Sequence, residues 1–289
     1  MARQLRVLNL GAGVQSTTLL LLVCRGDLPR LDAAIFADTG WEPQAVYAHL
    51  DWLTAQAEAA GIPVLRVSAG NLRTDLLQTV RGKMNHLANP PFFVWDAGAS
   101  AEHIRTLWGE EVRGERTGHR GRLLRKCTQA YKLAPIRQAV RALMREAGVR
   151  QVEQWMGISV DEAHRVKPSG VRYIRHRYPL IERGWSRQTC LDWLQAMGYP
   201  EPPKSACLGC PFHDDAYWVR LRDTSPAEWA DTVAVDHAIR TALPGVRGQV
   251  YMHRSCVPLE AVAFAPKPAA NVDQLRWDWT GECEGVCGI

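Results

Sequence analysis

Long hydrophobic runs are absent from this sequence of 289 residues. The longest unbroken apolar run, residues 19–23, is far shorter than the ~18 residues that a membrane-spanning helix requires. The N-terminal residues lead directly into a strand-like run, without the hydrophobic region of a signal peptide. We therefore expect a soluble, cytoplasmic protein with no membrane partner.

Lysine is also scarce, since only six of the 35 basic residues are lysine and the rest are arginine. Hydrophobic residues make up 46% of the chain and charged residues 22%, which excludes intrinsic disorder and coiled-coil composition. The arginine excess fits either a GC-rich genome or phosphate recognition, because guanidinium groups bind phosphate oxygens in pairs. Basic residues gather in segments 113–126 and 164–187, and this uneven distribution favours a phosphate-rich partner, either a nucleotide or a nucleic acid.

The first 70 residues predict alternating strands and helices. This order is typical of an α/β fold with a doubly wound parallel sheet, whose ligands bind at the carboxyl ends of the strands. Gly11 and Asp38 follow two of these strands. The expected strands are residues 5–10, 32–37 and 62–67, and the expected helices are residues 16–24 and 43–60.

The remaining chain predicts fewer regular elements. Residues 81–126 look irregular, and a segment of this length is typical of a lid or a binding loop. A proline-rich stretch near residue 199 suggests a nucleotide-binding domain over residues 1–198 and a smaller cysteine-bearing segment over residues 199–289 that packs over the active site. Further helices are expected at residues 135–147, 186–197 and 226–243, and a strand at residues 152–158.

Small residues and hydroxyl groups follow the first expected strand, over residues 11–18. They allow backbone N–H groups at a helix N-terminus to approach a phosphate, and the hydroxyls of Ser16 and Thr17 add donors. The segment lacks the Gly-Lys-Ser/Thr of a Walker loop and the third glycine of the dinucleotide pattern. A tight turn that needs small residues is the alternative interpretation.

This loop resembles the PP-loop, Ser-Gly-Gly-x-Asp-Ser, of ATP pyrophosphatases and adenine nucleotide alpha-hydrolases. Gly13 and Ser16 match the pattern, whereas Gly11, Ala12 and Gln15 replace a serine, a glycine and the aspartate.

Three later segments resemble the phosphoadenylyl-sulfate (PAPS) reductase family, in the order in which that family has them. They are the Asp-Thr-Gly of residues 36–42, the Arg-Lys-Cys-Thr stretch of residues 125–136 and the Gly-Ile-Ser element of residues 157–165. The resemblance implies a Rossmann-like, adenine nucleotide alpha-hydrolase-like fold that binds ATP, with magnesium expected beside it. It also implies that the loop holds the phosphates, that Asp38 lies by the adenosine and that Arg165 clamps a phosphate. The nucleotide-binding residues expected on this basis are Gly11, Ala12, Gly13, Gln15, Ser16, Thr17, Asp38 and Arg165.

Eight cysteines are unusual for a protein of a reducing compartment, where metal or redox chemistry is favoured over disulfides. Cys207 and Cys210 form a Cys-x-x-Cys pair of metal-binding type, but no second pair completes a zinc ribbon. Cys127 and Cys256 are the expected distant partners. The resemblance places Cys127 where related reductases have a cysteine pair and implies a [4Fe-4S] cluster, with zinc or unligated thiols as alternatives.

Cys283 and Cys287 lie in a glycine-containing C-terminal tail. The segment from Cys287 resembles the Cys-Gly-Leu of the mobile reductase tail, whose cysteine attacks the sulfonate sulfur, although the flanking glutamate and histidine are absent. We expect these two cysteines to be catalytic, with a role as further metal ligands as the alternative.

Three functions are compatible with these motifs. The first is ATP-dependent adenylation of a nucleic-acid or small-molecule acceptor, followed by sulfur transfer. The second is a thiol-dependent reductase of an adenylylated sulfate, and the third is a subunit that binds nucleotide or nucleic acid without catalysis. Phe92, Phe93 and Trp95 could stack a base, but we favour a role in capping the core. The sequence leaves the acceptor, the sulfur donor and the oligomeric state undetermined.

Overall fold

The computed structural model describes residues 4–83, 89–97 and 119–265, and these residues form two compact units. Unit 1 comprises residues 4–70 and 128–207, and unit 2 comprises the described residues of 71–127 and 208–265. The chain therefore leaves unit 1 after Gly70, returns at Thr128 and leaves again after Cys207. This interleaved arrangement differs from a linear division at residue 198. The packing of residues 199–289 over the active site remains a prediction.

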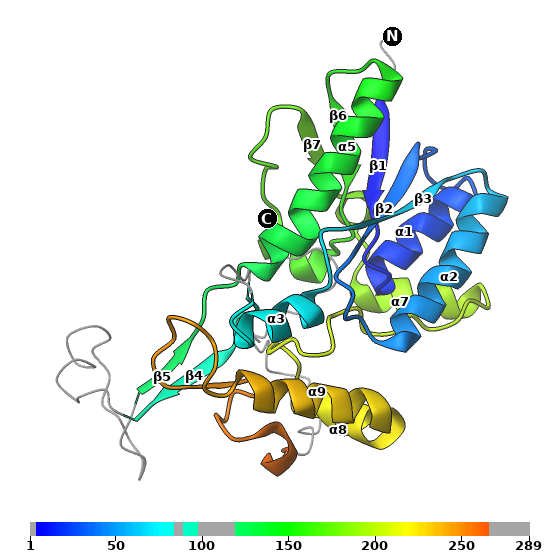
Figure 1. Ribbon diagram of the computed structural model, residues 1–289. Helices are drawn as coiled ribbons and strands as arrows, with labels where there is room; N and C mark the ends of the chain where they lie inside the picture. Colours follow the sequence, from blue (N-terminus) through cyan, green and yellow to red (C-terminus); the bar gives the residue numbers. More distant parts are fainter. Residues whose placement is uncertain (1–3, 84–88, 98–118, 266–289) are drawn as a thin grey trace. The chain divides into compact units, whose positions relative to one another are not determined.

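Unit 1 is built on a parallel five-stranded sheet, as expected for a doubly wound α/β fold (Figure 1). The strand order is β3-β2-β1-β6-β7, so the chain runs outward from β1 and then returns to the other side of β1. This reversal is the topological switch point at which such sheets bind ligands. The strands are β1 (Leu5–Asn9), β2 (Ala33–Asp38), β3 (Val64–Ser68), β6 (Val152–Trp155) and β7 (Ile174–Arg177).

Helices cover both faces of this sheet, each over its own buried apolar cluster. On one face Leu8 and Trp155 pack with side chains of α1 (Val14–Cys24), α2 (Gln44–Ala59) and α7 (Arg187–Ala196). On the other face Val7 packs with Val140 of α5 (Ala134–Ala147). The central strands are apolar on both sides because both faces are covered. Three short elements complete the unit: η1 (Thr128–Leu133), η2 (Val160–Arg165) and α6 (Pro179–Glu182).

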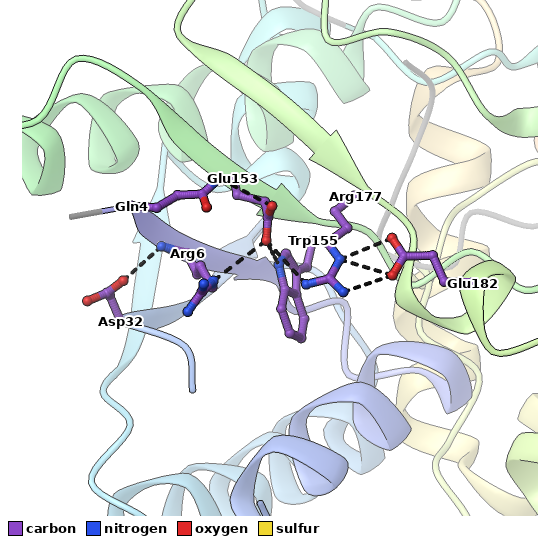
Figure 2. Close-up of polar contacts among 7 residues, drawn as sticks. All are labelled: Gln4, Arg6, Asp32, Glu153, Trp155, Arg177 and Glu182. Carbon is purple, nitrogen blue, oxygen red and sulfur yellow. Dashed lines mark hydrogen bonds and ion pairs between the residues drawn. The ribbon is translucent and has the colours of Figure 1, made fainter. Parts of the chain in front are cut away.

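A buried carboxylate joins three neighbouring strands of the sheet (Figure 2). Glu153 of β6 accepts a hydrogen bond from the Trp155 indole at 2.8 Å. Its carboxylate lies 3.4 Å from the Arg177 guanidinium of β7 and 3.7 Å from the Arg6 guanidinium of β1. Since a buried carboxylate without partners would be costly, these contacts allow Glu153 to occupy the sheet.

Unit 2 contains a three-stranded antiparallel sheet in the order β5-β4-β8. Two of its strands lie inside the segment that was expected to be irregular, which the sequence pattern did not reveal because each is only four residues long. The strands are β4 (Phe93–Asp96), β5 (His119–Arg122) and β8 (Gln249–Tyr251). Gly248 is required before β8, because a Cβ there would lie 2.4 Å from the Trp95 carbonyl oxygen.

Helices of unit 2 are α3 (Leu72–Val80), α8 (Asp215–Thr224) and α9 (Pro226–Ile239), with the short η3 (Leu259–Ala261) after them. Asp236 of α9 is fully buried and accepts hydrogen bonds from the Met252 N–H at 2.8 Å and the Leu259 N–H at 3.1 Å. Burial raises the pKa of the Asp236 carboxyl, while these bonds oppose the rise. One side chain thus fixes the chain after β8 against α9.

The helices expected after residue 130 are confirmed as α5, α7 and α9, although α9 ends at Ile239, four residues before the expected end at residue 243. Ser186 caps α7, since its hydroxyl accepts a hydrogen bond from the Thr189 N–H at 3.0 Å. Nowhere in the described part of the chain is a helix long and apolar enough to cross a membrane.

Candidate nucleotide and thiol site

The loop between β1 and α1 lies at the switch point of the unit 1 sheet. β1 ends at Asn9 and α1 begins at Val14, so the expected nucleotide-binding segment joins the central strand to its helix. Residues 10–18 are all buried. The first turn of a helix leaves backbone N–H groups without intrahelical acceptors, and its dipole favours an anion there.

Ala12 gives this loop an unusual backbone conformation. Its φ is +58°, in the left-handed region that glycine adopts without a steric penalty. Ser16 holds the turn from inside, because its hydroxyl accepts from the Gly11 N–H at 3.1 Å and donates to the Gly13 carbonyl at 3.3 Å. Gly13, which follows, is extended, with a φ of −95° and a ψ of −178°, so the left-handed residue leads directly into the N-cap of α1.

Gly157 follows β6 and lies directly against this loop. A Cβ at this position would be 2.9 Å from the Ser16 backbone nitrogen and 3.1 Å from its Cα. Any larger side chain would therefore displace the first turn of α1. The Gly-Ile-Ser element expected from the sequence is thus in contact with the predicted phosphate loop.

Gln15 connects the loop to the segment after β6 through its carboxamide. Its Nε2 donates to the Ser159 hydroxyl at 3.4 Å and to the Glu162 carboxylate at 3.2 Å. Glu162 in turn forms an ion pair with Arg165. Gln15, which stands where the PP-loop pattern has an aspartate, therefore places an amide next to Glu162, where a carboxylate would be repelled.

The Gln15 side chain also carries an unused acceptor. It is 1% exposed, and its Oε1 has no hydrogen-bond partner in the structure. A buried acceptor without a donor is destabilising, so such atoms are explained by a ligand, an ion or a water molecule. This atom lies on the first helical turn, where the sequence predicts a phosphate. Because an amide oxygen only accepts hydrogen bonds, it would be satisfied by a cation such as magnesium or by a donor group of the ligand, and not by the phosphate oxygens.

Asp38, expected beside the adenosine, is the last residue of β2. Its Oδ1 accepts hydrogen bonds from the Gly40 N–H at 2.7 Å and the Tyr47 hydroxyl at 2.9 Å. Burial raises the pKa of Tyr47, and the bond to Asp38 adds to the rise, so the phenol remains a donor. These bonds hold the Asp-Thr-Gly turn at the carboxyl edge of the sheet.

His49 of α2 contacts the first turns of α1 through Thr17. Its Nε2 lies 3.0 Å from the Thr17 hydroxyl, and the ring is 7% exposed. Burial lowers the pKa of His49 to about 4, so the ring is neutral at physiological pH. Thr17 is therefore bonded within the protein, as Ser16 is.

A thiol lies at the same edge of unit 1, near the end of β2. Ser205 donates a hydrogen bond to the Gly11 carbonyl, which attaches the segment before Cys207 to the nucleotide loop. The Cys207 Sγ lies 3.3 Å from the Thr39 hydroxyl and 3.5 Å from Glu42 Oε1. The structure thus brings one cysteine of the Cys-x-x-Cys pair into contact with the Asp-Thr-Gly turn.

Glu42 forms the anionic part of this thiol site. Its Oε1 lies 3.5 Å from the Lys132 ammonium group, and both side chains are buried, with 1% and 8% exposure. Its Oε2 is buried and has no hydrogen-bond partner. Among the described residues of unit 1, three buried side-chain oxygens have no hydrogen-bond partner, those of Gln15, Glu42 and Thr128. Gln15 lies in the first turn of α1, just after β1, and Glu42 lies in the turn after β2.

The four cysteines expected to hold a cluster are not gathered in one unit. Cys207 belongs to unit 1, whereas Cys127, Cys210 and Cys256 belong to unit 2. Over residues 4–83, 89–97 and 119–265, no three His, Cys, Asp or Glu side chains are placed to hold a metal ion. The [4Fe-4S] cluster on these four cysteines, with zinc as the alternative, stays a prediction.

Other expected residues fall elsewhere. Cys283 and Cys287 lie outside the described residues, and so do Arg113 and Arg116 of the first basic segment. Arg165 is linked to the loop indirectly, because it pairs with Glu162, which accepts a hydrogen bond from Gln15. Sequence analysis gave no role to Ser205, His49, Lys132 or Glu42; the last two were visible only as parts of the reductase-like segments.

Comparison with known proteins leaves the chain without a family. No protein-family model matches the sequence, and no curated protein matches it. Among solved structures, one similar chain is the U34-tRNA thiolase NcsA from Methanococcus maripaludis with its [4Fe-4S] cluster. The identity is 10% and the TM-score 0.35, over 93% of this chain and 84% of that one. At this level of likeness the function has to be inferred from the residues of the chain itself.

Proposed function

We propose that this protein is an adenine-nucleotide enzyme of the PP-loop type, which adenylates an acceptor with ATP and then transfers sulfur to it. The observation that carries the proposal is the loop of residues 11–17 at the switch point, with the buried, unpartnered Oε1 of Gln15 on its first helical turn. Cys207, in contact with the turn after β2, supports a thiol-dependent second step.

In the first step the chain would hold the triphosphate at the N-terminus of α1. Backbone N–H groups and the helix dipole stabilise the phosphates, and Gly157 lets the segment after β6 pack against the Ser16 backbone without displacing this turn. Arg165, fixed by its ion pair with Glu162, would contact a phosphate oxygen, and Asp38 would lie beside the adenosine. Magnesium would neutralise part of the triphosphate charge, as is usual for nucleotide sites.

The reaction follows from this placement. An oxygen of the acceptor attacks the α-phosphorus, the bond to the β-phosphate breaks and pyrophosphate leaves. Sulfur at the oxidation level of sulfide then attacks the activated carbon and displaces AMP, which keeps the acceptor's oxygen. Cys207 is the described thiol that lies against the turn after β2, and Lys132 lies at the Glu42 carboxylate beside it.

The iron–sulfur cluster on Cys127, Cys207, Cys210 and Cys256 remains part of the proposal, with zinc as the alternative. Its support is the Cys-x-x-Cys spacing, and a bound cluster would supply a Lewis-acidic iron for sulfur. Protein purified without oxygen should be brown, with a broad shoulder near about 400 nm, and Cys207→Ser or Cys210→Ser should remove it. A colourless preparation with stoichiometric zinc would favour the alternative.

One experiment separates the three functions that the sequence left open. Anaerobically purified protein is incubated separately with ATP, phosphoadenylyl sulfate and adenylyl sulfate. Release of pyrophosphate from ATP supports the proposal, whereas sulfite that disappears in Cys287→Ser supports the reductase. Binding of ATP without any turnover would identify a non-catalytic subunit.

A further inference from the structure

The sheet of unit 2 places arginines beside aromatic rings. In the antiparallel pair of β4 and β5, Arg120 is opposite Trp95 and Arg122 is opposite Phe93. Residues directly opposite one another project from the same face of a sheet, so two Arg–aromatic pairs lie side by side there. Both arginines are exposed and both rings are half-buried, whereas the preceding Phe92 is fully buried.

A third ring joins this face from the Cys-x-x-Cys segment. The Arg122 guanidinium lies 5.3 Å from the centroid of Phe212, and the Arg125 guanidinium lies 5.6 Å from it. These distances are those of cation–π contacts. Phe212 is half-buried and stands two residues after Cys210, so the arginines contact the segment that carries this cysteine.

The positive charge on this face is not neutralised by the described residues. Arg120, Arg122, Arg125 and Lys126 form no ion pair with any described carboxylate, while in the same unit Arg73, Arg240 and Arg254 each pair with an aspartate. A cluster of four such cations, three of them exposed and Arg125 half-buried, is suited to a polyanion. Leu124, in the middle of the stretch, is 77% exposed.

We propose that this face binds single-stranded nucleic acid, the acceptor of the reaction proposed above. The Arg–aromatic face consists of Phe93, Trp95, Arg120, Arg122, Arg125 and Phe212. Arginines would bind the phosphates, and the half-exposed rings would stack on bases, which are accessible in a single strand but not inside a duplex. An acidic protein would form ion pairs with the arginines, but its carboxylates would not stack on the aromatic rings.

That the bound strand is the acceptor rests on the proposed function. The binding of the strand to this face does not depend on that function or on ATP. Bound at the Arg–aromatic face, a nucleotide base would lie next to the segment of Cys210. A small-molecule acceptor could contact only a small part of an extended charged face of this kind. The structure therefore favours a nucleic acid over the small molecule that the sequence left open.

The test measures the affinity of the full-length protein for short fluorescently labelled RNA and DNA of one sequence, without ATP, over a range of salt concentrations. The double variant Arg120→Gln, Arg122→Gln is compared with Arg172→Gln, Arg175→Gln, which removes the same charge from two exposed arginines of the other basic segment. Trp95→Leu removes a stacking ring and keeps an apolar side chain. Circular dichroism and thermal melting confirm that each variant is folded.

We expect single strands to bind better than duplexes of the same length. The first double variant should lose about tenfold or more in affinity. The salt slope, which is the slope of the logarithm of the binding constant against the logarithm of the salt concentration, should fall in magnitude by roughly 1.4, the value for two lost phosphate contacts on a single strand. The control pair should lose less than about twofold, which would reflect net charge alone. Trp95→Leu should weaken binding by at least about fivefold without changing the salt slope.

Three results would overturn the inference: equal losses in the two double variants, no binding of single strands, or competition by polyglutamate as strong as that by unlabelled oligonucleotide. The last would point to an acidic protein partner. A preference for RNA over DNA, or the reverse, would identify the source of the strand and support the inference in either case. Because ATP is absent, these results are distinguishable from a failure of the nucleotide site.

Discussion

Gly157 stands so close to Ser16 that a methyl group at residue 157 would lie 2.9 Å from the Ser16 backbone nitrogen. Two segments about 140 residues apart in the chain therefore meet with no space for a side chain, at the turn where the phosphates of a nucleotide are expected. The closeness follows from the sheet, since β6 lies directly beside β1.

Gly157→Ala should weaken nucleotide binding by about tenfold or more, or ~1.4 kcal/mol, because the added Cβ must push the first turn of α1 out of position. Isothermal titration with ATP measures this directly. Gly148→Asn is the matched control: this glycine has a φ of +65°, which asparagine tolerates, and nothing lies within 4 Å of its Cβ position. Unchanged affinity in Gly157→Ala would place the phosphates elsewhere.

Gln15→Glu should destabilise unit 1, since a carboxylate would replace the amide that donates to Glu162. Two carboxylates within hydrogen-bond distance in a buried site repel, at a cost of about 1–3 kcal/mol. Adding Glu162→Gln restores one amide and one carboxylate, and should recover much of the loss. Chemical denaturation of both single variants and the double variant gives the coupling free energy. A coupling close to zero would mean that the two side chains do not interact.

His49 makes the stability of the protein depend on pH. Because burial lowers its pKa to about 4, below the unfolded value of 6.5, the unfolded state binds a proton first as the pH falls. The neutral ring thus contributes stability above pH 6.5, and this contribution is lost progressively between pH 6.5 and 4. Between pH 7 and 5 the loss should be roughly 2 kcal/mol.

The measurement is the free energy of unfolding at pH 7 and pH 5 for the wild type and for His49→Gln. Glutamine does not titrate, and it keeps a hydrogen-bonding group for Thr17. Other groups contribute equally to both proteins, so the difference in their pH dependence reports on His49. Parallel curves would show that the ring is exposed enough to be protonated without cost.

The sequence predicted the turn between β1 and α1 and the order of the first strands because both depend on local patterns. Apolar runs and small residues identify β1, the turn and α1 without any knowledge of distant contacts. Gly157 and Glu162 were included in a family-like segment, but their contacts with Ser16 and Gln15 depend on the pairing of β6 with β1. That pairing brings together residues far apart in the sequence, so spacing alone could not show it.

Short elements and buried partners were the hardest to predict. β4 and β5 contain four residues each, too few for a clear alternation, and Arg and Gly occur in β5. The contact between Ser205 and Gly11 has no sequence signal, since a lone serine after prolines is common in loops. The position of Cys207 beside Glu42 likewise follows from tertiary packing.

Lys132 and Glu42 provide the last prediction, because each is buried and each is charged. Lys132→Met should destabilise the protein by about 3 kcal/mol, since the Glu42 carboxylate then stays buried without its cation. The double variant with Glu42→Gln should recover most of this loss, because the amide oxygen can still accept from Thr39 and Cys207. The exposed pair of Arg222 and Asp223 is the control, and Arg222→Gln should cause no measurable change in the midpoint of urea unfolding. If Lys132→Met and Arg222→Gln behaved alike, the Glu42 carboxylate would have to be solvated, and its pairing with Lys132 would not be that of a buried ion pair.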